Sequence, residues 1–192
     1  MVFDKFKQMK MKITITRVPN ILTSIRIALV PLVCVLMFID GNVSRIISII
    51  LAGFASITDY FDGKIARKYN ACTAFGRCMD PIADKTLVMS LIVMLVYLEK
   101  AWVFPCIAIL FRELVVSGIR EFVAKEKQIT IKVSKLAKIK TATQMFSLLF
   151  LMAFATNDIL FIIGNFLLSI AALLSIVTSI QYIKSIQNVI FE

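Results

Sequence analysis

Four aspartates stand between two long apolar runs, in the stretch from residue 59 to residue 84. Asp59 and Asp62 are three residues apart, and Asp80 and Asp84 are four apart. On helices these spacings place the two members of each pair on one face, about a turn apart. Carboxylate oxygens are the ligands that hard divalent cations such as Mg²⁺ take. Two such pairs on facing helices predict a metal-dependent phosphoryl site at a membrane surface.

Two glycines and an arginine in the same stretch are suited to phosphate. Gly63 and Gly76 have no side chain, which lets a ligand approach the backbone closely. The guanidinium of Arg67 is a planar fork that can bind two phosphate oxygens at once. These residues strengthen the interpretation of the aspartates as a phosphoryl site.

The pattern D-x2-D-G-x2-A-R-x8-G-x3-D-x3-D, which begins at Asp59, resembles the signature of the CDP-alcohol phosphotransferases. Those integral membrane enzymes join a CDP-activated group to an alcohol and release CMP. Eight fixed positions at fixed spacing are far more specific than a lone D-x-x-D pair. All eight are filled here, by Asp59, Asp62, Gly63, Ala66, Arg67, Gly76, Asp80 and Asp84.

The resemblance implies roles for these residues. Two divalent cations, usually Mg²⁺ or Mn²⁺, would bridge the diphosphate of the CDP-lipid and be held by Asp59, Asp62, Asp80 and Asp84. Asp84 would also be the general base that takes the proton of the acceptor hydroxyl. The cytidine and its phosphates would contact Asn20, Thr23, Gly63, Arg67, Thr73 and Gly76. For Asn20 and Thr23, which follow Pro19, a helix N-terminal cap is the alternative.

The composition narrows the chemistry further. The chain contains no histidine, which excludes Ser-His-Asp catalysis, Cys-His catalysis and His-ligated zinc. Proton abstraction must therefore be done by a carboxylate, a lysine or a tyrosine. The four cysteines form no C-x-x-C pair, and we interpret them as reduced thiols.

A second group of charged residues lies in the C-terminal half. Arg112 and Arg120 are eight residues apart, close to two helical turns, so they share a face. Apolar residues flank Arg112, and a cation inside a membrane requires a partner. Glu113, adjacent in sequence, is predicted to point elsewhere, so an anionic substrate fits Arg112 better. Further basic residues follow at Lys132, Lys135, Lys138 and Lys140.

Three segments resemble one branch of the family, the bacterial phosphatidylglycerophosphate synthases, which use CDP-diacylglycerol and sn-glycerol 3-phosphate. They are P-N-I-L-T-x-x-R from residue 19, F-R-E-L-V-V-S-G-I-R-E from residue 111 and S-K-L-A-K-I-K-T-A-T-Q from residue 134. The resemblance implies a homodimer that makes phosphatidylglycerol phosphate and CMP. It also implies that Arg112, Arg120, Lys135 and Lys138 bind the acceptor phosphate. Ala137 stands where the branch commonly has glycine, and we expect it to shift a loop, which leaves the roles of Lys138 and Lys140 open.

Other functions share some of these sequence features. Inositol phosphate, serine or phosphatidylglycerol would be the acceptor in other branches of the same family. A cation transporter that uses intramembrane carboxylates would spread its acids over several spans, whereas the four aspartates here form one cluster. A regulator without catalysis is disfavoured by the intact motif. Nothing in the sequence indicates a nucleic-acid partner.

The elements that must position these residues follow from the hydropathy. The chain is 59% hydrophobic with a mean hydropathy of +0.88, which predicts an all-α integral membrane protein. Residues 1–18 are predicted to be a basic, amphipathic juxtamembrane segment that lies on the membrane or is partly disordered, without a cleavable signal peptide. Residues 19–192 are predicted to form a single six-helix domain. Its expected transmembrane helices cover residues 21–39, 43–58, 81–98, 101–123, 141–156 and 159–183, with a long loop over 125–140.

Charge asymmetry predicts how these helices cross the membrane. Of the 22 lysines and arginines, only Arg45 and Lys100 fall on the side of the short connections. The others lie on the side shared by both termini and the aspartates. Basic residues favour the cytoplasmic side. We therefore expect a multi-pass protein of the cell membrane with both termini and the active site in the cytoplasm.

Overall fold

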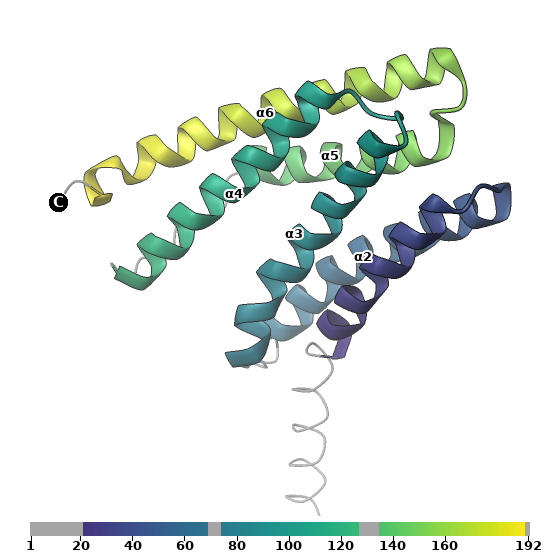
Figure 1. The fold of residues 1–192 in the computed structure, drawn as a ribbon. Coiled ribbons are helices and arrows are strands. Elements are labelled where there is room, and N and C mark those ends of the chain that lie inside the picture. The colour runs from purple at the N-terminus through teal and green to yellow at the C-terminus, as the bar shows by residue number, and fades with distance from the viewer. Residues whose placement is uncertain (1–20, 69–73, 127–134, 191–192) are drawn as a thin grey trace, which may run out of the picture. The chain divides into compact units, whose positions relative to one another are not determined.

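The computed structural model describes residues 21–68, 74–126 and 135–190. Within these ranges, only the backbone is described for residues 59–68, 74–78, 80, 81, 84, 124–126, 135 and 188–190. Every element in the described residues is an α-helix, which confirms the all-α prediction. The predicted juxtamembrane segment, 1–18, lies outside the described residues. The helices are a first helix over Ile21–Phe38, then α2 (Asn42–Lys68), α3 (Ala74–Tyr97), α4 (Val103–Glu126), α5 (Lys135–Phe154) and α6 (Asp158–Ile190) (Figure 1).

Each predicted span falls on one helix, but most helices extend beyond the apolar run that predicted them. α2 continues to Lys68 and α3 begins at Ala74, so both carry the aspartate motif. An apolar run marks the part of a helix that suits lipid, whereas backbone hydrogen bonds continue for as long as the chain stays helical. The loop predicted over 125–140 is wrong at its C-terminal end, because α5 begins at Lys135 and makes Ala137 helical.

The apolar surface indicates a membrane protein. The first helix and residues Asp158–Gln187 of α6 are long and apolar enough to cross a bilayer, with mean hydropathies of 2.4 and 2.5. Large apolar side chains are exposed on the outer faces of the helices, among them Phe104 at 85% and Ile159 at 70%. Lipid rather than water suits such surfaces. The number of six membrane-crossing helices stays a prediction.

The chain divides into two compact units, residues 1–91 and 92–192, and the boundary lies within α3. The first unit contains the first helix, α2 and α3 up to Leu91. Gly41, with φ of 151°, occupies the short turn between the first helix and α2. Small and branched apolar residues fill the interior of this unit, including Val33, Ala52, Ala55, Ala83 and Leu87. A single domain over 19–192 stays a prediction.

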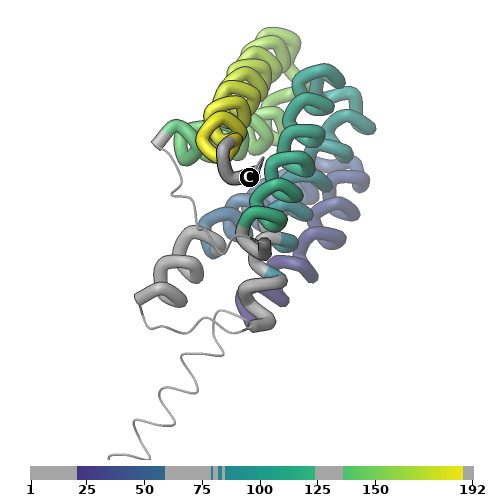
Figure 2. Tube along the Cα trace, turned by 90° about the vertical axis from the view of Figure 1, so that its left-hand side faces the viewer, coloured from purple at the N-terminus to yellow at the C-terminus, as the bar shows by residue number. Residues whose placement is uncertain are grey.

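The second unit is built around α6, which packs along α5 and α4 (Figure 2). Leu148, Leu151 and Leu168 are fully buried there. Gly164 of α6 permits the close approach to α5, because an added Cβ would lie 2.5 Å from Cδ2 of Leu151. The core of this unit therefore depends on the lack of a side chain at Gly164 as well as on large apolar side chains.

Local hydrogen bonds fix the connections at one end of the second unit. After α3 ends at Tyr97, Glu99 lies in the left-handed region with φ 57°, and the Lys100 N–H donates to the Leu95 carbonyl at 2.8 Å. The Trp102 N–H, just before α4, donates to Oδ1 of Asn165 at 2.6 Å. Asn157 caps α6, since its Oδ1 accepts from the N–H groups of Ile159 and Leu160. The connections from α3 to α4 and from α5 to α6 are short, as the sequence predicted.

Candidate functional site

The four aspartates lie on two helices of the first unit. Asp59 and Asp62 are in the C-terminal part of α2, and Asp80 and Asp84 are in the first half of α3. Because both segments are helical, the members of each pair share a face about a turn apart. Their side chains are outside the described part, so the ligand set stays a prediction. Among the side chains that are described, no three His, Cys, Asp or Glu residues gather as metal ligands would.

The residues predicted to bind the CDP-lipid also fall in the first unit. Gly63 and Arg67 lie on α2, and Gly76 lies in the first turn of α3. Asn20 and Thr73 lie outside the described residues. Thr23 is inside the first helix rather than at a cap, and it is fully buried. Arg26, three residues later and therefore on the same face, is buried as well.

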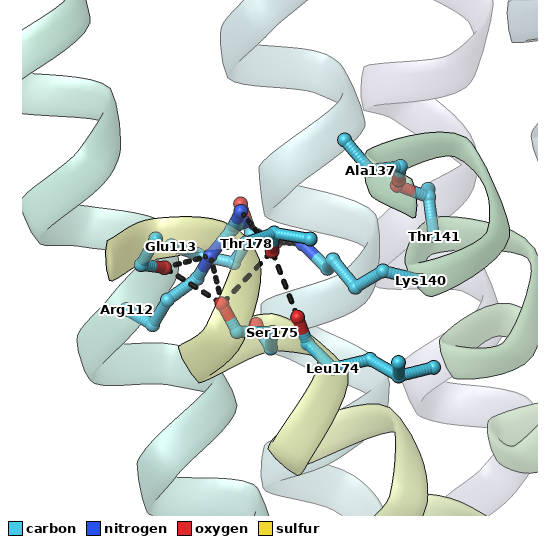
Figure 3. Close-up of polar contacts among 9 residues, drawn as sticks. Arg112, Glu113, Ala137, Lys140, Thr141, Leu174, Ser175 and Thr178 are labelled. Carbon is cyan, nitrogen blue, oxygen red and sulfur yellow. Dashed lines mark hydrogen bonds and ion pairs between the residues drawn. The ribbon is translucent and has the colours of Figure 1, made fainter. Parts of the chain in front are cut away.

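Arg112, on α4 in the second unit, is held by α6 (Figure 3). Its Nε donates to Oγ of Ser179 at 2.7 Å and to the carbonyl of Ser175 at 3.2 Å. Its Nη2 donates to Oγ1 of Thr178 at 3.3 Å. The three α6 residues are spaced i, i+3 and i+4, so they form one polar face within an apolar helix. That spacing is a sequence signal, and our sequence analysis did not use it.

Glu113 connects Arg112 to Lys140 of α5. Nη1 of Arg112 donates to Oε1 of Glu113 at 2.9 Å, and Nζ of Lys140 donates to the same oxygen. The side chains of Arg112, Glu113 and Lys140 are 12%, 18% and 4% exposed, respectively. We call these three residues the ion cluster.

The prediction that Glu113 points away from Arg112 was therefore wrong. Neighbouring residues leave a helix in directions about 100° apart, which follows from 3.6 residues per turn. Both side chains are nevertheless long enough to meet, and Lys140 binds the carboxylate from another helix. Sequence spacing within α4 gives no information about an ammonium on α5.

The remaining acceptor-site candidates differ in their surroundings. Arg120 is exposed, and its guanidinium carbon lies 5.5 Å from the centre of the Tyr182 ring of α6. Arg112 and Arg120 both contact α6, as expected of residues two turns apart on α4. Lys138 is exposed on α5, and Lys135 is the first residue of that helix. Lys140, whose role the sequence left open, is the buried lysine of this group.

Two of the four cysteines have side chains in the described part of the chain. The two whose side chains are described, Cys34 and Cys106, are free thiols, and Cys106 is buried. This agrees with their interpretation as reduced thiols in apolar surroundings.

Comparison with known proteins gives consistent matches. Residues 16–180 match the family model described as CDP-alcohol phosphatidyltransferase. Over 170 residues the chain is 44% identical to a CDP-diacylglycerol–glycerol-3-phosphate 3-phosphatidyltransferase of Rickettsia typhi, covering 87% of this chain and 95% of the relative. A protein of the same name from Rickettsia bellii is 46% identical, covering 87% and 93%. One from Pectobacterium atrosepticum is 32% identical, covering 91% and 97%.

Proposed function

The chain belongs to the CDP-alcohol phosphatidyltransferase family, and we propose that it transfers the phosphatidyl group of CDP-diacylglycerol to sn-glycerol 3-phosphate. The products are phosphatidylglycerol phosphate and CMP. The relatives from Rickettsia typhi and Pectobacterium atrosepticum are named for this donor and this acceptor. The family match confirms that the chain is a transferase of phospholipid biosynthesis.

The observation that carries the choice of a phosphate-bearing acceptor is the pair of cations in the ion cluster. The guanidinium of Arg112 and the ammonium of Lys140 lie beside one carboxylate, Glu113, in a mostly buried place. Guanidinium and ammonium groups bind phosphate oxygens. Glycerol 3-phosphate and inositol phosphate both carry a phosphate, whereas serine and choline carry none, and the names of the relatives favour glycerol 3-phosphate. Arg120, Lys135 and Lys138 add positive charge along the same two helices.

The chemistry itself belongs to the aspartates of the first unit. Enzymes of this family use divalent cations, and four carboxylates on α2 and α3 fit the oxygen preference of Mg²⁺ or Mn²⁺. Two bound cations would offset the charge on the diphosphate oxygens and on the departing CMP. Asp59, Asp62, Asp80 and Asp84 would hold them.

Asp84 also acts as the general base in this proposal. Its carboxylate takes the proton of the free primary hydroxyl of glycerol 3-phosphate. The hydroxyl oxygen then forms a bond to the β-phosphorus of CDP-diacylglycerol, and the bond from that phosphorus to the bridging oxygen of CMP breaks. The chain contains no histidine, so a carboxylate beside the reacting oxygen is the simplest base.

The donor enters from the lipid, and its cytidine diphosphate contacts Asn20, Thr23, Gly63, Arg67, Thr73 and Gly76. We further propose that the protein spans the cell membrane several times, with the active site and both termini in the cytoplasm. The basic residues gathered on that side of the chain support this orientation. A homodimer is proposed by resemblance to the family.

A product assay tests the proposal. Purified protein is offered CDP-diacylglycerol with glycerol 3-phosphate, inositol phosphate, serine or phosphatidylglycerol, and lipid products and CMP are measured. We expect phosphatidylglycerol phosphate with glycerol 3-phosphate, loss of product with EDTA, and recovery with Mg²⁺ or Mn²⁺. Product from another acceptor instead would refute the assignment of glycerol 3-phosphate. Full activity in a metal-free preparation would refute the role of the carboxylates as metal ligands.

A further inference from the structure

The ion cluster contains a carboxylate that the reaction does not itself require. Glu113 is not among the residues predicted to hold metal, donor or acceptor. It nevertheless contacts both cations of the cluster through one oxygen, Oε1, and so joins α4 to α5. The carboxylate of Glu113 therefore has a role of its own, distinct from phosphate binding by the cations.

We propose that Glu113 is a positioning residue for the acceptor-phosphate site, a role that rests on the function proposed above. Its carboxylate fixes Nη1 of Arg112 from one side, while Ser179 and Thr178 of α6 fix Nε and Nη2 from the other. The same carboxylate keeps Nζ of Lys140 beside Arg112. Two cations that would otherwise repel are thus held together, ready for one phosphate.

The chemistry of the contact supports positioning over a purely structural role. Buried ion pairs can often be replaced by apolar residues of similar volume without loss of stability. Joining α4 to α5 therefore does not require charged residues. A guanidinium can bind two phosphate oxygens at once, so the orientation of the fork of Arg112 decides how well the acceptor phosphate binds.

The first experiment replaces Glu113 by Gln, which keeps the shape and removes the charge. Apparent KM values for both substrates, kcat and the thermal unfolding midpoint are measured on the purified protein. We expect the KM for glycerol 3-phosphate to rise roughly tenfold or more, with the KM for CDP-diacylglycerol nearly unchanged. Glu113→Asp, which keeps the charge on a shorter side chain, should recover part of the loss. Glu121→Gln, on an exposed residue of the same helix, is the matched control and should match the wild type.

A double variant separates positioning from structure. Glu113→Gln combined with Lys140→Met removes one charge of each sign and so keeps the net charge of the cluster. Lys140→Met alone is the reference, because it removes the same cation and leaves Glu113 in place. If Glu113 is a positioning residue, the double variant should have a higher KM for glycerol 3-phosphate than Lys140→Met, because Arg112 has lost the group that orients it. Equal KM values in these two variants would show that the carboxylate is structural and would overturn the proposal.

Two outcomes distinguish this inference from the proposed function. If the wild type makes phosphatidylglycerol phosphate but Glu113→Gln has an unaltered KM for glycerol 3-phosphate, the positioning role is wrong and the function stands. If the wild type makes no product from glycerol 3-phosphate, the proposed function is wrong. In that case direct binding of glycerol 3-phosphate, measured by calorimetry on wild type and Glu113→Gln, decides whether the cluster binds a phosphate. Equal or absent binding in both would overturn the inference.

Discussion

At the scale of single residues, the two arginines of α4 illustrate how much the environment decides. Both are guanidinium groups on one face of the helix, yet Arg112 is enclosed by Glu113 and by hydroxyls of α6. Arg120 is exposed over the ring of Tyr182. An enclosed fork is preorganised, so a bound phosphate need not first order the side chain. Arg112 is accordingly the better candidate for setting the position of the acceptor.

Asp84 is the residue on which the proposed chemistry depends most. Replacing it by Asn removes both the proposed general base and one proposed metal ligand while nearly preserving the volume. General-base catalysis typically contributes roughly 10²- to 10⁴-fold, so we expect turnover to fall at least a hundredfold. Steady-state rates with saturating substrates test this, and the unfolding midpoint checks that the variant is folded. A variant that retains more than about a tenth of the wild-type rate would show that Asp84 is not the base.

At the scale of elements, the start of α5 changes the interpretation of one substitution. Ala137 was expected to shift a loop, but it lies in a helix, where its carbonyl accepts from Oγ1 of Thr141 at 3.0 Å. Alanine favours a helix over glycine by up to about 1 kcal/mol. The departure from glycine is therefore compatible with the helix that holds Lys140 in the ion cluster.

The contact between α5 and α6 gives a sharp test of packing. A methyl group at Gly164 would meet Cδ2 of Leu151 at 2.5 Å and Cδ1 of Phe150 at 3.1 Å, and Leu151 is fully buried. Overpacking of this kind costs about 1–3 kcal/mol, so Gly164→Ala should lower the thermal unfolding midpoint of the purified protein.

Gly118→Ala is the matched control for that substitution. An added Cβ at Gly118 of α4 has nothing within 4 Å. We expect an unchanged or slightly higher midpoint, because alanine is the better helix former by about 1 kcal/mol. Equal midpoints for the two variants would mean that Leu151 moves aside at no cost and that the contact is not tight.

At the scale of the whole molecule, the prediction concerns how the chain crosses the membrane. Fusions to alkaline phosphatase, which is active only outside the cytoplasm, can be placed after Lys100 and after Glu192. Because the basic residues concentrate on the side of the termini, we expect activity after Lys100 and none after Glu192. A second fusion after Asn157, in another short connection, should also be active. The reverse pattern in a bacterial host would overturn the orientation.

The sequence by itself determined the class of protein, the place of each helix and the position of the aspartate motif along the chain. These properties are local: a run of apolar residues specifies a helix suited to lipid, and the spacing of Asp59, Asp62, Asp80 and Asp84 is written along the chain. The helix ends were less predictable, because helices continue past the apolar runs into polar segments.

The tertiary structure alone decided the partners of the buried charges. Glu113 binds Lys140, which is 27 residues away, and Arg112 binds hydroxyls more than 60 residues away. Such contacts depend on which helices lie side by side, and the periodicity of one helix does not report its neighbours. For that reason Glu113 was misjudged from its position beside Arg112. Packing against α5 and α6 turned a residue expected to point away into the centre of the ion cluster.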